Sequence, residues 1–142
     1  MATRRQLRDL AHLRLREAEA LFDAGLFDGC AYLCGYVVEL ALKARICATL
    51  GVEAYPPETA SRRLNEAFLT HNFDDLKILA GMQNELSAEH QEVWINWLIA
   101  SKWNPNWRYE PQGKYDKRAA EEILDAIRKK PDGALECISS RW

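Results

Sequence analysis

The longest apolar stretch of the chain covers residues 28–51, where the only charges after Asp28 are Glu39, Lys43 and Arg45. A segment that is apolar nearly all round predicts a central helix that its neighbours bury on several sides. Asp28 can cap the first turn of this helix, and Gly51 can end it in a left-handed conformation. Because Glu39 and Lys43 are four residues apart, we expect them to pair along the helix.

Upstream of that segment, apolar residues recur at helical spacing from Thr3 to about Asp23. Thr3 and Gln6 have the spacing of a capping box, and Gly25 can close the helix. The short connection predicts that the first two helices are antiparallel neighbours. Arg14 falls on the apolar face and therefore needs a partner, for which Glu39 is the candidate.

The second half of the chain has helical periodicity without a segment that alternates like a strand. We expect helices over residues 61–69, 73–80, 87–101 and 116–130, the last three capped by Asn72, Ser87 and Asp116. The predicted fold class is all-α, an up-and-down four-helix bundle core with an additional short helix, or about five helices in all. Residues 1–133 form the bundle, and residues 134–142 a C-terminal tail.

Composition narrows the possible functions. The 142 residues carry a formal net charge of -2, so no global positive field indicates a nucleic-acid binder. The first sixteen residues are locally basic, which fits either a binding patch or a solvated helix face. The sequence shows no secretory signal, and the charges on the apolar segment argue against a membrane span. We expect a cytoplasmic protein with no membrane partner.

The sequence contains no pattern typical of a cofactor or metal site. The four cysteines, Cys30, Cys34, Cys47 and Cys137, contain no CxxC pair, and the histidines are scattered, so we expect no metal site. No GxGxxG, P-loop, HExxH or GxSxG motif occurs, and no cofactor is expected.

The stretch KWNPNWRYEPQGKY, residues 102–115, combines helix-breaking residues with Trp103, Trp107, Arg108 and Tyr109. A polar loop with so many aromatic side chains either folds back on the bundle or presents a surface to a ligand. Stacking on nucleic-acid bases is worth about 1 to 3 kcal/mol per base, so the two tryptophans are candidates for that role.

With these segments identified, the chain resembles the HEPN domain family of prokaryotes over roughly residues 5–130. The resemblance rests on the long helix, on a histidine before a short leucine-bearing helix, and on an Arg-Tyr pair before the last helix. The matching positions are Asp28, Tyr32, Leu33, Tyr36, Glu39, Leu42, Lys43, Ala44, His71, Leu76, Arg108 and Tyr109.

The resemblance implies a four-helix core with an added helix, a homodimer, and work on RNA or a nucleotide. Many members are metal-independent RNases of toxin-antitoxin or defence systems, and others have a minimal nucleotidyltransferase protein as partner. The RNases use an Arg followed after four to six residues by a His near a dimer interface. Here only Arg5 and His12 have that spacing, and they lie in the first helix. No histidine follows Arg108 within six residues, so the usual motif is missing from its expected place and enzymatic activity is left open.

Seven residues are the candidate site. The catalytic candidates are Arg108, which would contact phosphate, and His71 or Glu39, which would handle a proton. The ligand-binding candidates are Tyr109, Trp107, Trp103 and Lys43. Each residue also has an alternative, purely structural role. It could connect the loop to the bundle, pack as an aromatic side chain in the core, or belong to a polar network. The alternative function is a non-catalytic helical adaptor that partners a nucleotidyltransferase through its basic N-terminal helix or its tryptophan loop.

Overall fold

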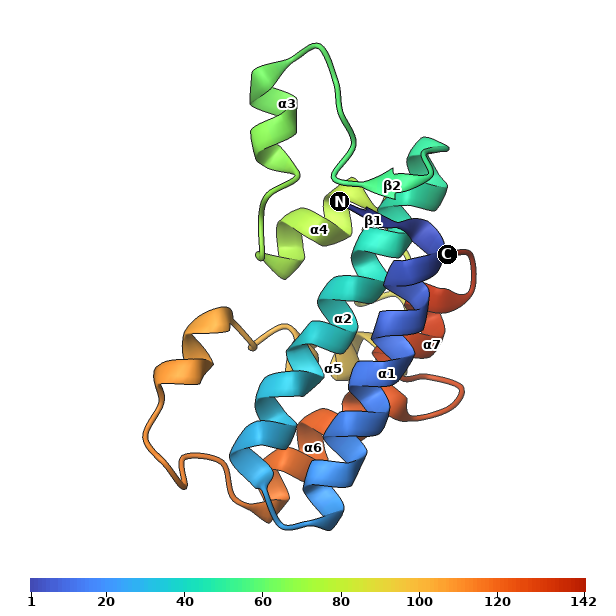
Figure 1. Ribbon diagram of the computed structural model, residues 1–142. Helices are drawn as coiled ribbons and strands as arrows, with labels where there is room; N and C mark the ends of the chain where they lie inside the picture. Colours follow the sequence, from blue (N-terminus) through green and yellow to red (C-terminus); the bar gives the residue numbers. More distant parts are fainter.

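A pair of long antiparallel helices, α1 (Arg4–Asp23) and α2 (Phe27–Leu50), forms the centre of the computed structural model, which describes residues 1–142 (Figure 1). The predicted capping box starts α1: Thr3 Oγ1 accepts from the Gln6 amide at 3.2 Å, and Gln6 Oε1 accepts from the Thr3 amide at 2.8 Å. Gly25 turns the chain with φ of 75°. The predicted antiparallel pairing is confirmed.

Helix α2 is buried on several sides, as its composition predicts, and Gly51 ends it with φ of 66°. The predicted cap at Asp28 is wrong, because the helix begins one residue earlier and no side chain caps it. The Asp28 carboxylate instead accepts from the backbone amides of Gly113 at 2.7 Å and Tyr115 at 2.9 Å. It therefore fastens a distant loop to the start of α2.

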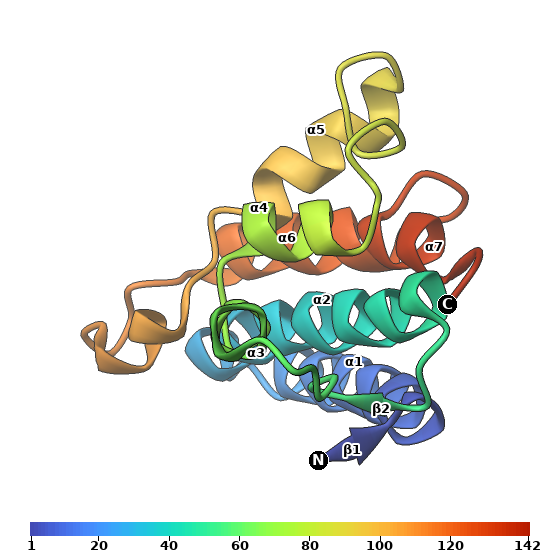
Figure 2. The same cartoon turned by 90° about the horizontal axis from the view of Figure 1, so that it is seen from above.

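Four shorter helices cover the side of α2 that faces away from α1. They are α4 (Phe73–Leu79), α5 (Gln91–Ala100), α6 (Lys117–Arg128) and α7 (Ala134–Ser139). Figure 2 shows α2 between α1 and a layer of α4, α6 and α7, with α5 on the outer side of that layer. Asn72 and Asp116 cap α4 and α6 as predicted.

Two segments project from this bundle. One carries α3 (Arg62–Ala67), and the other carries η1 (Pro105–Tyr109), a short 3-10 helix inside the aromatic loop (Figure 1). A two-residue ladder pairs β1 (Ala2–Thr3) antiparallel with β2 (Ala54–Tyr55). Seven α-helices are the main secondary structure, which confirms the all-α class but exceeds the about five helices expected. None of these helices has the length and apolar character needed to cross a bilayer.

Two predicted boundaries are wrong. Ser87 does not cap a helix: α5 starts at Gln91, and the Ser87 hydroxyl donates to the Asn84 carbonyl at 2.7 Å in a local turn. Residues 134–142 are not a tail, because α7 lies there and buries Ala134, Leu135 and Ile138 against the core. The turn at residues 87–90 and the helix at residues 134–139 are each so short that helical periodicity cannot tell a helix from a turn there.

The predicted partner of Arg14 is also wrong. Arg14 binds Glu17 on its own helix, with Nη1 2.9 Å from one carboxylate oxygen and 2.7 Å from the other. The Arg14 side chain is 33% exposed, so it reaches solvent rather than the interface of α1 with α2. Glu39 takes its partners elsewhere.

Candidate functional site

A stripe of polar side chains runs along one face of α2. Figure 1 shows the segments that carry α3 and η1 projecting from the bundle at two places along this helix. Residues at spacings of three and four share one face of a helix. The stripe consists of Tyr32, Tyr36, Glu39 and Lys43. The rest of α2 is mostly apolar and buried, and its other buried charge, Arg45, is occupied by the Ile138 carbonyl at 3.1 Å, so these four residues are where chemistry can be placed.

Glu39 is the centre of the stripe and is only 4% exposed. Its Oε1 accepts from Lys43 Nζ at 2.6 Å, which confirms the expected pairing along the helix. The same oxygen lies 2.9 Å from Nδ1 of His71. Oε2 is buried without any hydrogen-bond partner. A buried carboxylate oxygen without a donor is costly, so this atom is a position where a hydrogen-bond donor of a ligand would be stabilised.

His71 connects this buried carboxylate to the surface, since 56% of its side chain is exposed. When Nδ1–H donates to Glu39, the other ring nitrogen, Nε2, is left free to accept a proton. His71 also lines a cavity of 240 Å³ together with Asn72, Asp74, Ser101, Asn104 and Pro105. The arrangement is that of a general base oriented by a carboxylate.

Lys43 is held in place on both sides. Its ammonium pairs with Glu39 and lies 5.3 Å from the ring centre of Tyr55 on β2. The Tyr55 hydroxyl donates to the carbonyl of Phe68, and burial raises the Tyr55 pKa above its ordinary value. Lys43 thus supplies a fixed positive charge next to the Glu39 carboxylate.

The other end of the stripe is aromatic. The hydroxyls of Tyr32 and Tyr36 lie 3.0 Å apart. Burial first, and then this hydrogen bond, raise the pKa of Tyr36 to about 12. Trp103 packs behind both rings, and its Nε1 donates to the Tyr32 carbonyl at 3.0 Å. Tyr36 therefore stays neutral at physiological pH, and whichever hydroxyl of the pair does not donate to the other can donate to a ligand.

Arg108 lies on η1 at this aromatic end. It is exposed, forms no ion pair, and its guanidinium carbon lies 4.7 Å from the Tyr109 ring centre. The hydroxyl of Tyr109, and less strongly that of Tyr32, raise the pKa of Arg108 above its ordinary value. An exposed guanidinium without a carboxylate partner is available to an anionic ligand.

The structure brings together Glu39, Lys43 and His71 among the predicted site residues, and places Arg108 near Tyr32. Trp103 is 3% exposed and packs in the core, and its edge lines the same cavity as His71, so its proposed role in ligand binding stays a prediction. Gly35 makes room for it, since a Cβ at that position would lie 1.9 Å from Trp103 Cδ2. Tyr109 is 74% exposed.

Trp107 lies outside the stripe. Its ring stacks on Tyr115 at 4.6 Å between centres and lines a separate pocket with α6. It therefore shares no wall with Tyr109. Tyr32, Tyr36 and Tyr55 complete the surroundings of the site, and the regular spacing of Tyr32, Tyr36, Glu39 and Lys43 was the sequence signal for the first two.

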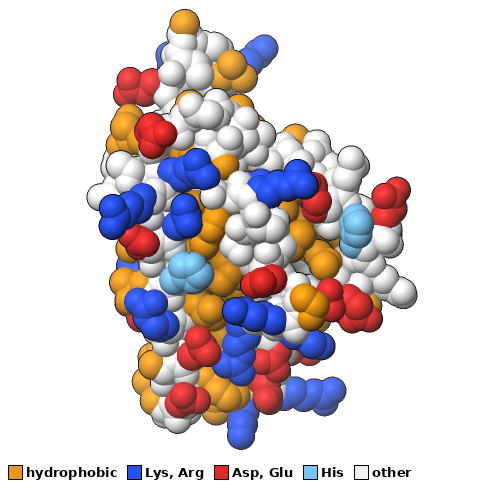
Figure 3. Space-filling model, turned by 90° about the vertical axis from the view of Figure 1, so that its right-hand side faces the viewer, with side chains coloured by type: hydrophobic (Ala, Val, Ile, Leu, Met, Phe, Trp, Pro, Cys, Tyr) orange, Lys and Arg blue, Asp and Glu red, His pale blue; other side chains and the backbone are white.

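The basic N-terminus is a different surface. Arg4 Nη2 donates to the Trp142 carbonyl at 2.6 Å, and the Arg8 guanidinium lies 5.5 Å from the Trp142 ring centre. On the side of the molecule that Figure 3 presents, Lys and Arg side chains are interspersed with Asp and Glu side chains and with apolar surface. Arg4 and Arg8 therefore hold the C-terminal residue Trp142 against α1.

The described residues contain no group of three or more His, Cys, Asp or Glu side chains placed to hold a metal ion. No protein-family model, curated protein or solved structure gives a significant match to this chain.

Proposed function

We propose that this chain is a HEPN-like module of a toxin-antitoxin or defence system that acts on RNA. The observation that carries the proposal is the contact between the buried Glu39 carboxylate and Nδ1 of the half-exposed His71. The unpartnered Arg108 near the other end of the same stripe supports an anionic ligand. A base, its orienting carboxylate and a free guanidinium are groups that RNA cleavage needs.

The proposed reaction uses these groups in fixed roles. Nε2 of His71 takes the proton of a ribose 2′-hydroxyl, whose oxygen attacks the adjacent phosphorus. The bond from phosphorus to the 5′-oxygen breaks, and that oxygen takes a proton from water while His71 returns the proton it took to solvent. The products carry a 2′,3′-cyclic phosphate and a 5′-hydroxyl. Lys43 lies next to His71 and offsets charge on the phosphate. No metal ion takes part in these steps.

The spacing of the stripe favours an RNA strand over a single nucleotide. Tyr32 and Glu39 are seven residues apart, or roughly 10 Å along the helix at 1.5 Å per residue. Arg108 therefore contacts a phosphate that neighbours the one at His71. It contributes mainly to binding, whereas His71 contributes to the chemical step.

The assembly we propose has three parts. Helices α1, α2, α5 and α6 form an up-and-down four-helix core. Two copies associate through α5, where Ile95 and Leu98 are 46% and 43% exposed. A minimal nucleotidyltransferase is the partner protein, and the complex works in the cytoplasm.

The test is incubation of the purified protein with a mixed RNA pool in the presence of a chelator, next to the Arg108→Ala variant. We expect cleavage by the parent and weaker RNA binding with slower cleavage by the variant. The matched control is Arg16→Ala, which removes an exposed, unpaired arginine on α1. Unchanged binding and cleavage in a folded Arg108→Ala variant would contradict the proposal.

The second candidate function is a non-catalytic adaptor. It is favoured by an apolar groove of 430 Å³ between α3 and α4, whose lining includes Leu69 and Ile78, 65% and 54% exposed. Exposed apolar side chains of this kind mark protein interfaces. For an adaptor, Leu69→Asp would abolish binding to the partner protein, and Arg108→Ala would change nothing.

A further inference from the structure

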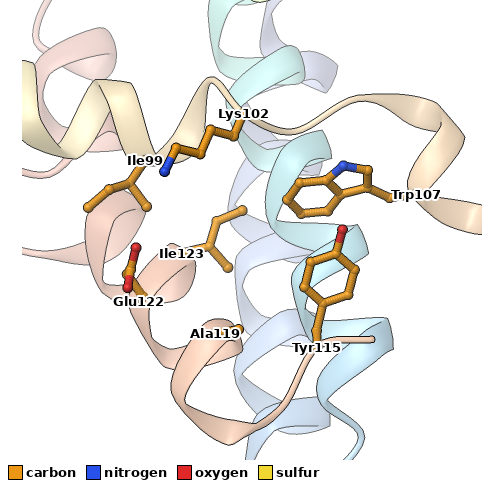
Figure 4. Close-up of a pocket in the computed structure, with 7 residues that line it drawn as sticks. All are labelled: Ile99, Lys102, Trp107, Tyr115, Ala119, Glu122 and Ile123. Carbon is orange, nitrogen blue, oxygen red and sulfur yellow. The ribbon is translucent and has the colours of Figure 1, made fainter. Parts of the chain in front are cut away.

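A second pocket lies on the other side of the aromatic loop, where η1 and the end of α5 meet α6. Its volume is 220 Å³, and Figure 4 shows the seven side chains that line it. Ile123 lies across the middle of the pocket, and Trp107 and Tyr115 form one wall (Figure 4). None of the chemistry described above uses this pocket.

The aromatic wall is held in place. Trp107 and Tyr115 stack at 4.6 Å between ring centres, with 29° between their planes. The Tyr115 backbone is fixed in turn, since its amide donates to the Asp28 carboxylate at 2.9 Å. A wall that is ordered before a ligand arrives reduces the entropy cost of binding.

The opposite end of the pocket is charged. In Figure 4 the Lys102 ammonium and the Glu122 carboxylate both lie near Ile99, away from the aromatic wall. Both side chains are exposed, and neither forms an ion pair with any residue. A ligand in the pocket therefore meets an apolar wall on one side, and one donor and one acceptor group on the other.

The volume of the pocket suits a small, flat chemical group. The volume of 220 Å³ exceeds the about 150 Å³ of a cavity that holds a benzene ring, and it falls below the roughly 300 Å³ where pockets for drug-sized ligands begin. One ring system fits here, but a whole nucleotide does not.

We propose that this pocket binds a purine base, with guanine as its best ligand. The ring would pack against Trp107 and Tyr115. On its Watson-Crick edge, guanine offers two neighbouring N–H donors to the Glu122 carboxylate. Its O6 and N7 accept from Lys102. Adenine offers only one such donor group, and a pyrimidine covers less of the wall.

This inference rests on the proposed action on RNA and adds its base preference. Arg108 directly follows Trp107 in η1, so neighbouring residues of one short helix would serve the phosphate and the base. An RNA strand would then be bound around η1, with guanine on the α6 side and the backbone on the α2 side. Cleavage would occur at a fixed distance from a guanine.

The test is calorimetric titration of the full chain with guanosine, adenosine and uridine, which carry no phosphate. Guanosine should bind about tenfold more tightly than uridine, and Glu122→Gln should weaken guanosine binding about tenfold. Trp107→Ala should remove nucleoside binding. The matched control is Glu121→Gln, an exposed neighbour on α6 that does not line the pocket and should leave binding unchanged.

Two results would overturn the inference: no saturable guanosine binding by the folded parent, or guanosine binding that Glu122→Gln leaves unchanged. Its failure can be told apart from failure of the proposed function. If RNA is cleaved but guanosine does not bind, the pocket assignment is wrong and the RNase function stands. If guanosine binds with the expected variant effects but RNA is neither bound nor cleaved, the RNA function is wrong and the base pocket stands.

Discussion

The Nδ1 atom of His71 lies 2.9 Å from Oε1 of Glu39, although 32 positions separate the two residues in the chain. This contact joins the surface to a carboxylate that is otherwise enclosed by α2 and its neighbours. It also gives the imidazole a defined orientation, with one nitrogen fixed and the other outward.

The ion pair of Lys43 with Glu39 should contribute to stability. Lys43→Met leaves the buried carboxylate with His71 as its only partner, and we expect a loss of about 3 kcal/mol in the free energy of unfolding. Combining Lys43→Met with Glu39→Gln removes the uncompensated charge and should recover most of that loss. Urea denaturation measures both. Lys114→Met, at an exposed and unpaired lysine, serves as the control. A Lys43→Met variant as stable as the parent would contradict the prediction.

The contact of Gly35 with Trp103 should tolerate no side chain. A Cβ on Gly35 would lie 1.9 Å from Trp103 Cδ2, so Gly35→Ala forces the buried indole to move, and overpacking of this kind costs about 1 to 3 kcal/mol or more. Gly29 lies on a different face of α2, and a Cβ there would lie 3.2 Å from the Leu21 Cδ1 methyl, which can move. Gly29→Ala should therefore change the stability little. Thermal unfolding compares the two variants. Equal melting temperatures would contradict the close packing of Trp103 on Gly35.

Asp28 should make the stability of the aromatic loop depend on pH. The amide of Gly113, and then that of Tyr115, hold the pKa of Asp28 below its ordinary value of 3.8. The stabilisation is therefore complete above that ordinary value and is lost as the pH falls through the lower folded value. The parent should be more stable than Asp28→Asn at pH 6, with the difference shrinking below pH 4. Asp23→Asn, at an exposed aspartate without a side-chain partner, should show no such difference.

A negative charge placed on the exposed face of α5 should prevent self-association through that helix. Leu98→Glu places a carboxylate on the exposed apolar face of α5, and we expect it to convert the proposed dimer into a monomer. Light scattering after size-exclusion chromatography measures the mass. Leu26→Glu, at a residue that is 57% exposed in the turn before α2, is the matched control and should leave a dimer. A dimer that survives Leu98→Glu would place the interface elsewhere.

Local features of the fold could be predicted from the sequence because they depend on neighbouring residues. The caps at Thr3, Asn72 and Asp116, and the burial of α2, follow from spacing and polarity alone. Asp28 failed as a cap because two amides from residues 113 and 115 compete for its carboxylate. That contact crosses most of the chain, and no local pattern encodes it.

In the site too, contacts between neighbouring residues could be predicted and contacts between distant residues could not. The pairing of Glu39 with Lys43 could be predicted because both residues lie on one helix. The contact of His71 with Glu39 could not, because it depends on how the chain returns from β2 to α4. Trp103 and Trp107 look alike in a polar loop, yet one fills the space above Gly35 and the other lines the pocket on α6. Only the packing of the loop distinguishes the buried tryptophan from the half-buried one.

The most direct test of the central claim is cleavage of an end-labelled RNA in chelator by the parent and by His71→Gln. We expect products with 2′,3′-cyclic phosphate ends from the parent and a rate at least about 100-fold lower for the variant, with RNA binding retained. His90→Gln, at an exposed histidine, should cleave normally. Intact RNA with the parent, or equal cleavage by His71→Gln, would show that His71 and Glu39 form a structural contact rather than a catalytic pair.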